Sequence, residues 1–182
     1  RPISMGRLQA GLDAQGAVVA YSHKVCGQSI FAHLFPQNIR NGIDPSSVDG
    51  THNQAYKWPT AKFDFVMRNT HVPVGPWRGV NTNQNGVFLE CFMDEVARAA
   101  GKDPLEFRRA ILQNHPKHLA VLNAAAEKGD WGKPLPAGVH RGAIVEFAES
   151  SGPHRRACGF GLRPEVPARV RGSCRFWAQP GY

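Results

Sequence analysis

One segment of the chain places an arginine directly in front of a predicted helix. In VPVGPWRGVNTNQNGVFLECFMDEVARAAG, residues 72–101, Arg78 stands between a tryptophan and a glycine. A guanidinium offers a planar fork of donors, and a helix N-terminus adds backbone N–H groups and the positive end of the helix dipole. Four amide side chains next to it could add donors and acceptors: Asn81, Asn83, Gln84 and Asn85. The combination suits a polar, anionic cofactor.

A structural role for Arg78 is the alternative. An arginine before a helix can also bind a carbonyl or pair with a surface acid, while the neighbouring Trp77 covers core. The sequence has neither the Walker A pattern nor G-x-G-x-x-G, which argues against an ordinary nucleotide site. The residues by themselves leave both roles of Arg78 open.

The segments before the arginine loop show strand patterns. Residues 7–12 and 17–26 are apolar-rich runs around the turn DAQG and predict a β-hairpin. Residues 61–70 alternate between apolar and polar types and predict a third strand that leads to the loop. Residues 36–60, rich in Pro, Asn, Asp, Gly and Ser, predict a long surface excursion, a kind of loop that often carries function or contacts a partner.

Three helix patterns follow the loop: residues 86–100, 104–114 and 117–128. The first has an apolar stripe at 3.6-residue spacing and ends at Gly101. Its Glu90 is assigned to packing or helix-end electrostatics rather than to catalysis. The second begins with Asp103, Pro104 and Glu106 at the N-cap, N1 and N3 positions of a capping box. Strands followed by helices predict an α+β fold.

The positive charge of the chain is concentrated near its C-terminus. The 182 residues have a formal net charge of +8, of which residues 1–150 contribute +3 and residues 151–182 contribute +5. The longer segment has no basic stripe with interleaved aromatic residues, so a nucleic-acid interaction would depend on the tail. No apolar run approaches 18 residues, which argues against a transmembrane segment.

The cysteines and histidines do not predict a metal site. The four cysteines lie far apart and form no C-x-x-C pair, which argues against structural zinc and against thioredoxin-like chemistry. Cys91 in a helix pattern and Cys26 in a strand pattern are predicted to be small buried hydrophobic residues. His115 and His118 flank a proline where one helix pattern gives way to the next, so no metal is predicted there.

The arginine segment resembles the Arg-Gly-x-x-x-x-Gln-x5-Glu-Cys segment of the molybdenum hydroxylases, the xanthine oxidase and aldehyde oxidoreductase family. Five residues fall on that pattern without a gap: Arg78, Gly79, Gln84, Glu90 and Cys91. AAGKDPLEFRRAIL is similar to the helix pair that follows in the large subunit. The isoquinoline 1-oxidoreductase beta-subunit type also resembles the hairpin and the segment HPKHLAVLNAAAEKGDWGKPLPAGVHRG. The resemblance covers roughly residues 1–142.

The resemblance implies roles for the residues of the loop. Arg78 would be catalytic and, with Gly79 and Gln84, would bind a molybdopterin cofactor, in bacteria usually the cytosine dinucleotide form. Trp77 and Val80 would shape the substrate funnel. The family often has an aromatic residue where Val80 stands, so the substrate class stays open. No residue of this chain is predicted to be a metal ligand.

The resemblance also implies an activity, the hydroxylation of an aldehyde or an N-heterocycle with water as the oxygen donor. The implied partners are a small subunit that carries [2Fe–2S] clusters and an electron acceptor, for which a c-type cytochrome is one candidate. No carboxylate here matches the family's catalytic glutamate, and other cofactor loops are missing, so the isolated chain is expected to be inactive. A bacterial periplasm or cytoplasm is the expected location, with no signal region in the sequence.

The sequence is therefore divided into two parts. Residues 1–142 are interpreted as a fragment of a molybdenum-cofactor-binding domain, a β-hairpin and strands followed by a three-helix segment. Residues 143–182 form an atypical Arg/Gly/Pro-rich tail, interpreted as frame-shifted or disordered, and residues 151–182 are expected to be poorly ordered or weakly packed. Two other function classes stay open: a non-enzymatic α+β interaction module, and a nucleic-acid binder that acts through the basic tail.

Overall fold

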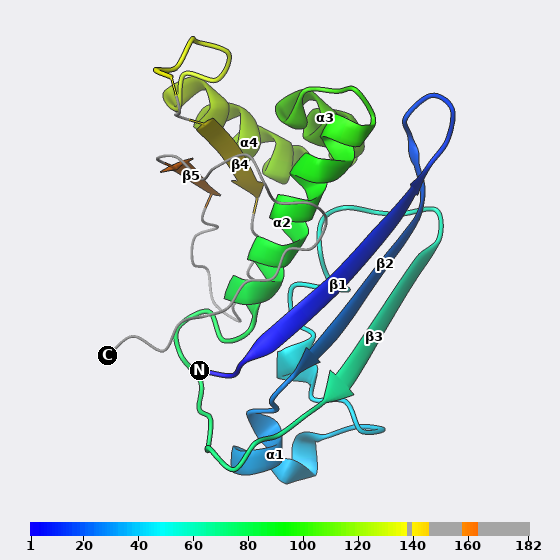
Figure 1. Cartoon of the computed structure of the whole chain (residues 1–182), viewed down its shortest axis with the longest axis vertical. Helices are drawn as coiled ribbons and strands as arrows, with labels where there is room; N and C mark the ends of the chain where they lie inside the picture. The colour runs from blue at the N-terminus through cyan, green and yellow to red at the C-terminus, as the bar shows by residue number, and fades with distance from the viewer. Residues whose placement is uncertain (138–139, 146–157, 164–182) are drawn as a thin grey trace.

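The computed structural model describes residues 1–137, 140–145 and 158–163. Figure 1 shows the helices α2, α3 and α4 on one side of a three-stranded sheet, with a two-stranded ribbon beyond α2. The elements in chain order are β1 (Ser4–Leu12), β2 (Val18–Gly27), α1 (Phe31–Leu34), η1 (Pro36–Asn38), η2 (Pro45–Ser47), β3 (Ala61–Met67), α2 (Thr82–Ala99), α3 (Pro104–Ile111), α4 (Pro116–Lys128), β4 (His140–Val145) and β5 (Cys158–Arg163). The predicted α+β fold is confirmed.

The sheet has the order β1-β2-β3. β1 and β2 form the predicted antiparallel hairpin, and the carboxylate of Asp13 closes its turn by accepting from the backbone N–H groups of Gln15 and Ala17. β3 pairs with β2 in parallel and ends at Met67, three residues before its predicted end. One more backbone bond follows, from the Arg68 N–H to the Gly27 carbonyl at 2.9 Å, and after it the carboxamide of Asn69 accepts from the backbone N–H of Ser29 at 2.8 Å.

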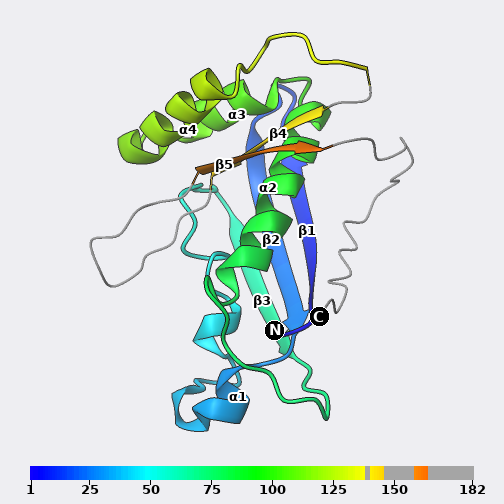
Figure 2. The same cartoon turned by 90° about the vertical axis from the view of Figure 1, so that its left-hand side faces the viewer.

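The main core lies between the inner face of this sheet and α2. Tyr21 and Val25 of β2 are buried, as are Leu89 and Met93 of α2, and Figure 2 shows α2 running along the strands. The apolar stripe of α2 fills this interface, which is the physical reason for its 3.6-residue period. At Gly6 the strand β1 approaches α2 closely: a Cβ there would lie 2.8 Å from the Phe88 ring.

The 36–60 segment is only partly the surface excursion that its composition predicts. Asp44, Ser47, Thr51 and Tyr56 are buried. Asp44 organises the segment by accepting from the Ser29 hydroxyl at 2.7 Å and from the Phe31 backbone N–H at 3.0 Å, among other donors. Burial alone would raise the pKa of this carboxyl, but the hydrogen bonds outweigh it and lower the pKa. A loop rich in turn residues thus becomes a packed part of the domain.

The later helices begin as their sequence predicts. The Asp103 carboxylate accepts from the backbone N–H groups of Leu105 and Glu106, and Pro104 is the first residue of α3. α4 also begins with a proline, Pro116. None of the helices in the described ranges is long and apolar enough to cross a membrane.

The tail contains a strand that the sequence did not predict. β5 pairs antiparallel with β4, from His140 opposite Arg163 to Val145 opposite Cys158. The expectation that the aperiodic composition of residues 151–182 cannot continue a strand is therefore wrong for six of them. These residues form a strand because they pair with β4, although their local sequence does not favour one. The rest of that tail, with the nucleic-acid interpretation that depends on it, lies outside the described residues.

Candidate functional site

The arginine loop is shorter than the sequence predicts. α2 begins at Thr82, four residues before the predicted start, and Asn81 is its N-cap residue. Arg78 therefore stands on a tight turn, closed by hydrogen bonds from the Val80 N–H to the Trp77 carbonyl at 2.7 Å and from the Thr82 N–H to the Gly79 carbonyl at 3.0 Å. The amide side chains that were predicted to lie in a loop belong to the first turn of the helix.

Two consecutive residues of this turn have a left-handed backbone. The φ angle is 81° at Gly79 and 46° at Val80. A Cβ at the first position would also overlap Oδ1 of Asn83, so that side chain would have to move. The Asn83 amide group in turn donates to the Arg78 carbonyl at 2.9 Å. A β-branched residue in the left-handed region is strained, so Val80 stores strain beside Arg78.

The amides of the first helical turn bind the 36–60 segment rather than an open site. The Asn81 amide donates to the Ser46 carbonyl at 2.9 Å. The Asn85 amide donates to the carbonyls of Ser47 and Asp49, at 3.0 and 2.8 Å. Asn81 and Asn85 are buried, which corrects the prediction that these groups face a cofactor.

Gln84, which was predicted to bind the cofactor, donates from its amide nitrogen to Oδ1 of Asn81. Its donor is therefore used inside the protein, by the residue at the N-cap position of α2. Because Asn81 also holds the Ser46 carbonyl, Gln84 supports the contact between α2 and the 36–60 segment. The sequence signal that could have shown this is the run of amides itself, since amides that crowd a helix start commonly satisfy nearby backbone groups.

Arg78 and Trp77 are exposed side by side at the surface. The Trp77 side chain is 64% exposed, and the guanidinium carbon of Arg1 lies 5.5 Å from the centroid of its ring. Arg78 is also exposed. Within the described residues its guanidinium makes no hydrogen bond and no ion pair, so nothing described there acts as the carbonyl or carboxylate partner that a structural cap requires. The charged group is available to a ligand or to another part of a larger protein.

A buried ion-pair network between α2 and α3 was missed by the sequence analysis. Arg108 of α3 donates from Nε to the Glu90 carboxylate at 3.0 Å and from an Nη to the Glu90 carbonyl at 2.8 Å. It also contacts Asp94 at 2.6 Å. The Tyr56 hydroxyl donates to Glu90 at 3.3 Å. Glu90, assigned from the sequence to packing or helix-end electrostatics, is a buried partner in this ion-pair network.

Burial and charge act in opposite directions in this network. Burial by itself would lower the pKa of Arg108, but the carboxylates of Glu90 and Asp94 outweigh it and raise the pKa. Burial raises the pKa of Tyr56 well above its ordinary value. Arg108 therefore stays cationic and Tyr56 stays neutral, which suits a structural network better than a proton-transfer site.

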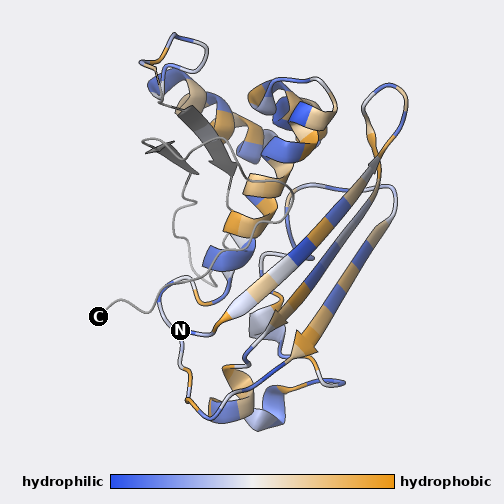
Figure 3. Cartoon of the chain, viewed as in Figure 1, coloured by the Kyte–Doolittle hydropathy of each residue, from blue (hydrophilic) through white to orange (hydrophobic). Residues whose placement is uncertain are grey.

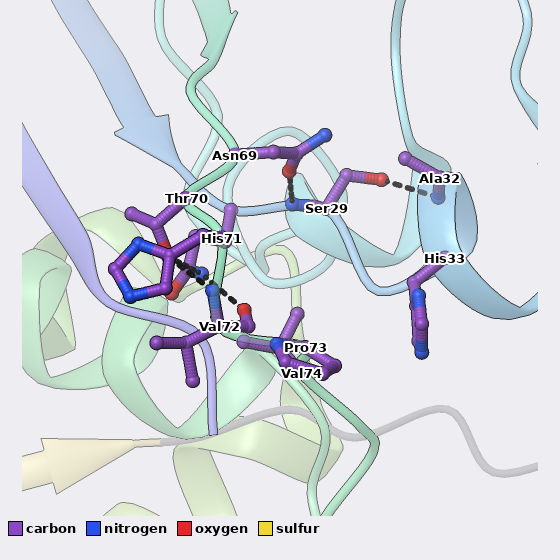
Figure 4. Close-up of a pocket in the computed structure, with 10 residues that line it drawn as sticks. Ser29, Ala32, His33, Asn69, Thr70, His71, Val72, Pro73 and Val74 are labelled. Atoms are coloured by element: carbon purple, nitrogen blue, oxygen red, sulfur yellow. Dashed lines mark hydrogen bonds between the residues drawn. The ribbon is translucent and has the colours of Figure 1, made fainter.

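A cavity of about 200 Å³ opens where β2 ends. Figure 4 shows His33 and His71 at opposite ends of this cluster, with Ser29 and Asn69 between them. Most of its polar groups bind one another: the Gln28 carboxamide, for example, donates to the Thr70 hydroxyl at 2.9 Å. The segment that follows His71 leads to the arginine loop, so the cavity adjoins the path of the loop.

The described residues contain no cluster of metal-binding side chains, and Cys26 and Cys91 are not fully buried. No group of three or more His, Cys, Asp or Glu side chains could hold a metal ion there. The rings of His115 and His118 meet edge to face, with centroids 5.7 Å apart. Cys26 and Cys91 are half-buried rather than buried, and Cys26 lies on the face of β2 opposite to that of Tyr21 and Val25.

Residues 4–112 match the family model of the molybdopterin cofactor-binding domain. The chain belongs to this family. The match includes the arginine loop, α2 and the Glu90–Arg108 pair, and it confirms the resemblance on which the sequence analysis relied. The exposed Arg78 is therefore part of a molybdopterin cofactor-binding domain.

Two curated relatives are much longer than this chain. The beta subunit of isoquinoline 1-oxidoreductase from Brevundimonas diminuta is 33% identical over 124 residues, which cover 67% of this chain and 16% of the relative. The B subunit of nicotinate dehydrogenase from Pseudomonas putida strain KT2440 is 28% identical over 131 residues, which cover 68% of this chain and 11% of the relative. The chain spans about one sixth or less of either relative.

Solved structures confirm the fold. Quinoline 2-oxidoreductase from Pseudomonas putida 86 and the aldehyde oxidoreductase from Desulfovibrio desulfuricans ATCC 27774 both superpose with a TM-score of 0.55 and 18% identity. Each superposition covers 79% of this chain, and 21% and 17% of the respective structures. At this identity the likeness shows a shared fold.

The predicted cofactor residues of the domain fit a molybdopterin group unequally. Arg78 fits, because it is exposed and its donors have no partner among the described residues. Gly79 is exposed, but the space that its missing Cβ leaves is filled by Asn83 and is no cradle for a ligand. The amide nitrogen of Gln84 is already bound to Asn81. Arg78 is the residue of this set that could hold an anionic oxygen.

Proposed function

We propose that this chain is the part of a molybdenum hydroxylase catalytic subunit that presents Arg78 to the molybdopterin cofactor and the substrate. The observation that carries the proposal is an exposed arginine on a strained turn, inside the family match and in front of an 18-residue helix. A surface arginine kept only for solubility would not need two left-handed residues beside it. Strain of this kind gathers at functional sites.

The complete subunit would hydroxylate an aldehyde or an N-heterocycle with water as the oxygen source. When bound, the molybdenum cofactor supplies the oxygen-transfer and electron-accepting chemistry. Arg78 places a fixed positive charge where negative charge develops on oxygen atoms in the transition state. Trp77 and Val80 stand on either side of the Arg78–Gly79 pair and would shape the approach of the substrate.

Two substrate classes come into question, N-heterocycles and aldehydes. The names of the two curated relatives, isoquinoline 1-oxidoreductase and nicotinate dehydrogenase, favour an N-heterocycle, whereas a solved structure with the same fold is named an aldehyde oxidoreductase. Val80 has no aromatic ring that could stack on a substrate, so Trp77, 64% exposed, is the aromatic surface that the loop offers. We therefore propose an N-heterocycle as the first substrate to test.

The remaining parts of the proposal concern what the complete enzyme binds. The cofactor would be the cytosine dinucleotide form, and electrons would leave through [2Fe–2S] clusters on a separate small subunit to an acceptor such as a c-type cytochrome. The two curated relatives are named as subunits, which supports a multi-subunit enzyme. A bacterial periplasm or cytoplasm is the proposed location.

The test replaces Arg78 by alanine in a complete subunit that carries this domain, assembled with its cofactor. Turnover is measured with isoquinoline and with an aromatic aldehyde, and molybdenum content is measured by mass spectrometry. We expect turnover to fall about a hundredfold or more, as for loss of one transition-state donor. Arg109→Ala on α3 is the matched control, because Arg109 is partly exposed and lies outside the arginine loop. Unchanged turnover in the Arg78 variant would contradict the proposal.

A further inference from the structure

The outer face of the three-stranded sheet is left without a covering layer in the described part of the chain. Figures 1 and 2 show α2, α3 and α4 on the inner side. The strand register places the outward residues in rows across the sheet. One row is Met5, Cys26 and Val66, and Met5 is 60% exposed. Along the strands, hydrophobic and hydrophilic residues alternate (Figure 3).

A row of apolar residues argues that this face is covered in the complete subunit. The row of Met5, Cys26 and Val66 would place an apolar strip against whatever covers the sheet. An exposed apolar strip rimmed by polar residues commonly marks an interaction site.

The charges on this face indicate which kind of surface would bind it. Arg7 of β1 stands directly opposite Lys24 of β2, and both are exposed. Like charges opposite one another destabilise a sheet. One carboxylate is near them: Asp64 stands opposite Lys24, but it is paired with Lys62 at 3.4 Å. Three cations against one acid leave a net positive surface that an acidic partner would stabilise.

We propose that the outer face of this sheet docks an acidic surface of another domain of the same molybdenum hydroxylase subunit. The lengths of the curated relatives favour this occupant, because the matched part of the chain accounts for 16% or less of them. The tail of this chain is a poor occupant, since residues 151–182 have a net charge of +5. The inference rests on the proposed function only because that function makes the chain one part of a longer subunit.

Cys26 provides a direct probe, because it lies in the apolar row and is half-buried in this structure. Alkylation of Cys26 by iodoacetamide is followed by peptide mass spectrometry in the 182-residue chain and in a complete subunit that contains it. Each rate is divided by the rate in denaturant. We expect Cys26 to react about tenfold or more slowly in the complete subunit, as for a site that reacts only on local opening.

Charge reversal tests the acidic partner. Arg7→Glu/Lys24→Glu in the complete subunit should restore the reactivity of Cys26, whereas Lys117→Glu/Lys128→Glu, the same change in charge on exposed positions of α4, should leave it protected. Equal reactivity in the chain and in the complete subunit would overturn the proposal. Protection that arises only after the small subunit is added would also overturn it, and would assign the face to that subunit.

The outcome of the Cys26 experiment does not depend on the catalytic role proposed for Arg78. Arg78→Ala should leave the protection of Cys26 unchanged even where turnover is lost. If Cys26 is protected but the Arg78 variant keeps its turnover, the docking surface stands and the catalytic proposal fails. If the Arg78 variant loses turnover but Cys26 stays reactive, the reverse holds.

Discussion

The guanidinium of Arg108 and the carboxylate of Glu90 meet at 3.0 Å in a place where neither side chain is exposed. The two residues come from neighbouring helices, α3 and α2, and Asp94 and Tyr56 complete the cluster. A buried ion pair is costly to desolvate and contributes little net stability by itself. The pair instead fixes how α3 is aligned on α2, because rotating α3 by one residue would leave the buried guanidinium unpaired.

The first prediction follows from the cost of burying a charged group without its partner. Arg108→Ala leaves the Glu90 carboxylate buried without its cation and should lower the free energy of unfolding by about 3–5 kcal/mol. Its neighbour Arg109 is partly exposed and paired with Glu106 at the surface, so Arg109→Ala should cost less than about 1 kcal/mol. Urea unfolding of the two variants measures both. Equal costs would show that burial of the Arg108 pair does not carry the effect.

Local elements were predictable from the sequence because their causes are local. The hairpin, the third strand and the three helices follow from periods of 2 and 3.6 residues, and the capping of α3 by Asp103 follows from residues adjacent in the chain. Arg108 was not singled out, because its partner lies 18 residues away on another helix. Which of two consecutive arginines faces the core depends on the rotation of the helix, and packing decides that.

The second prediction concerns the attachment of the 36–60 segment to α2. Asn85 is fully buried and gives both amide hydrogens to carbonyl oxygens, of Ser47 and Asp49. Asn85→Ala leaves these acceptors without donors and should cost about 2–4 kcal/mol. Asn83→Ala removes one bond in a more exposed place and should cost about 1 kcal/mol. Thermal unfolding of both variants should show this order, and the reverse order would refute the attachment.

The amides also show where sequence reasoning about a site fails. A run of Asn and Gln beside an arginine has the same chemistry whether it faces a ligand or a backbone. The structure decides that Asn81 and Asn85 are buried against the 36–60 segment, which the sequence places more than 20 residues away. The composition of that segment predicted a loop, and no local pattern indicated where the loop would pack.

The third prediction tests the strain beside Arg78. Val80 has a φ of 46°, a region that costs a β-branched residue about 1–2 kcal/mol and that asparagine enters more readily. Val80→Asn should therefore raise the free energy of unfolding by about 1 kcal/mol. Val19, 44% exposed on β2, is the control, since asparagine is depleted in strands and Val19→Asn should destabilise the protein. Loss of stability in both variants would contradict a strained Val80.

The fourth prediction is a dependence of stability on pH. Burial lowers the pKa of His23 from 6.5 to about 4, and its side chain is 1% exposed. Between these values the unfolded chain binds a proton that the folded chain does not, so stability falls as the pH falls through this window. Below about pH 4 His23 adds no further loss. The complete effect is about 3 kcal/mol.

Unfolding in urea at several pH values between 6.5 and 4.5 measures that slope. His23→Gln should flatten it, because glutamine does not titrate. Asp44, the buried carboxyl with a lowered pKa, loses its contribution below its ordinary value of 3.8, which lies outside the window. A slope that is unchanged in the glutamine variant would assign the pH dependence to groups other than His23.

The last prediction separates chemistry from stability at Arg78. Its guanidinium is exposed and has no partner among the described residues, so Arg78→Ala should change the free energy of unfolding by less than about 1 kcal/mol. In the complete, cofactor-loaded subunit the same change should reduce turnover about a hundredfold or more. Arg78→Lys keeps the charge but not the planar fork of donors, and it should recover part of that turnover. Melting temperature and turnover are measured on the same preparations. A structural arginine would show the opposite pattern: a loss of several kcal/mol, as for a broken buried pair, with an activity that follows the folded fraction. Arg108→Ala should show that structural pattern within the same domain. Each of the two arginine variants is therefore a control for the other.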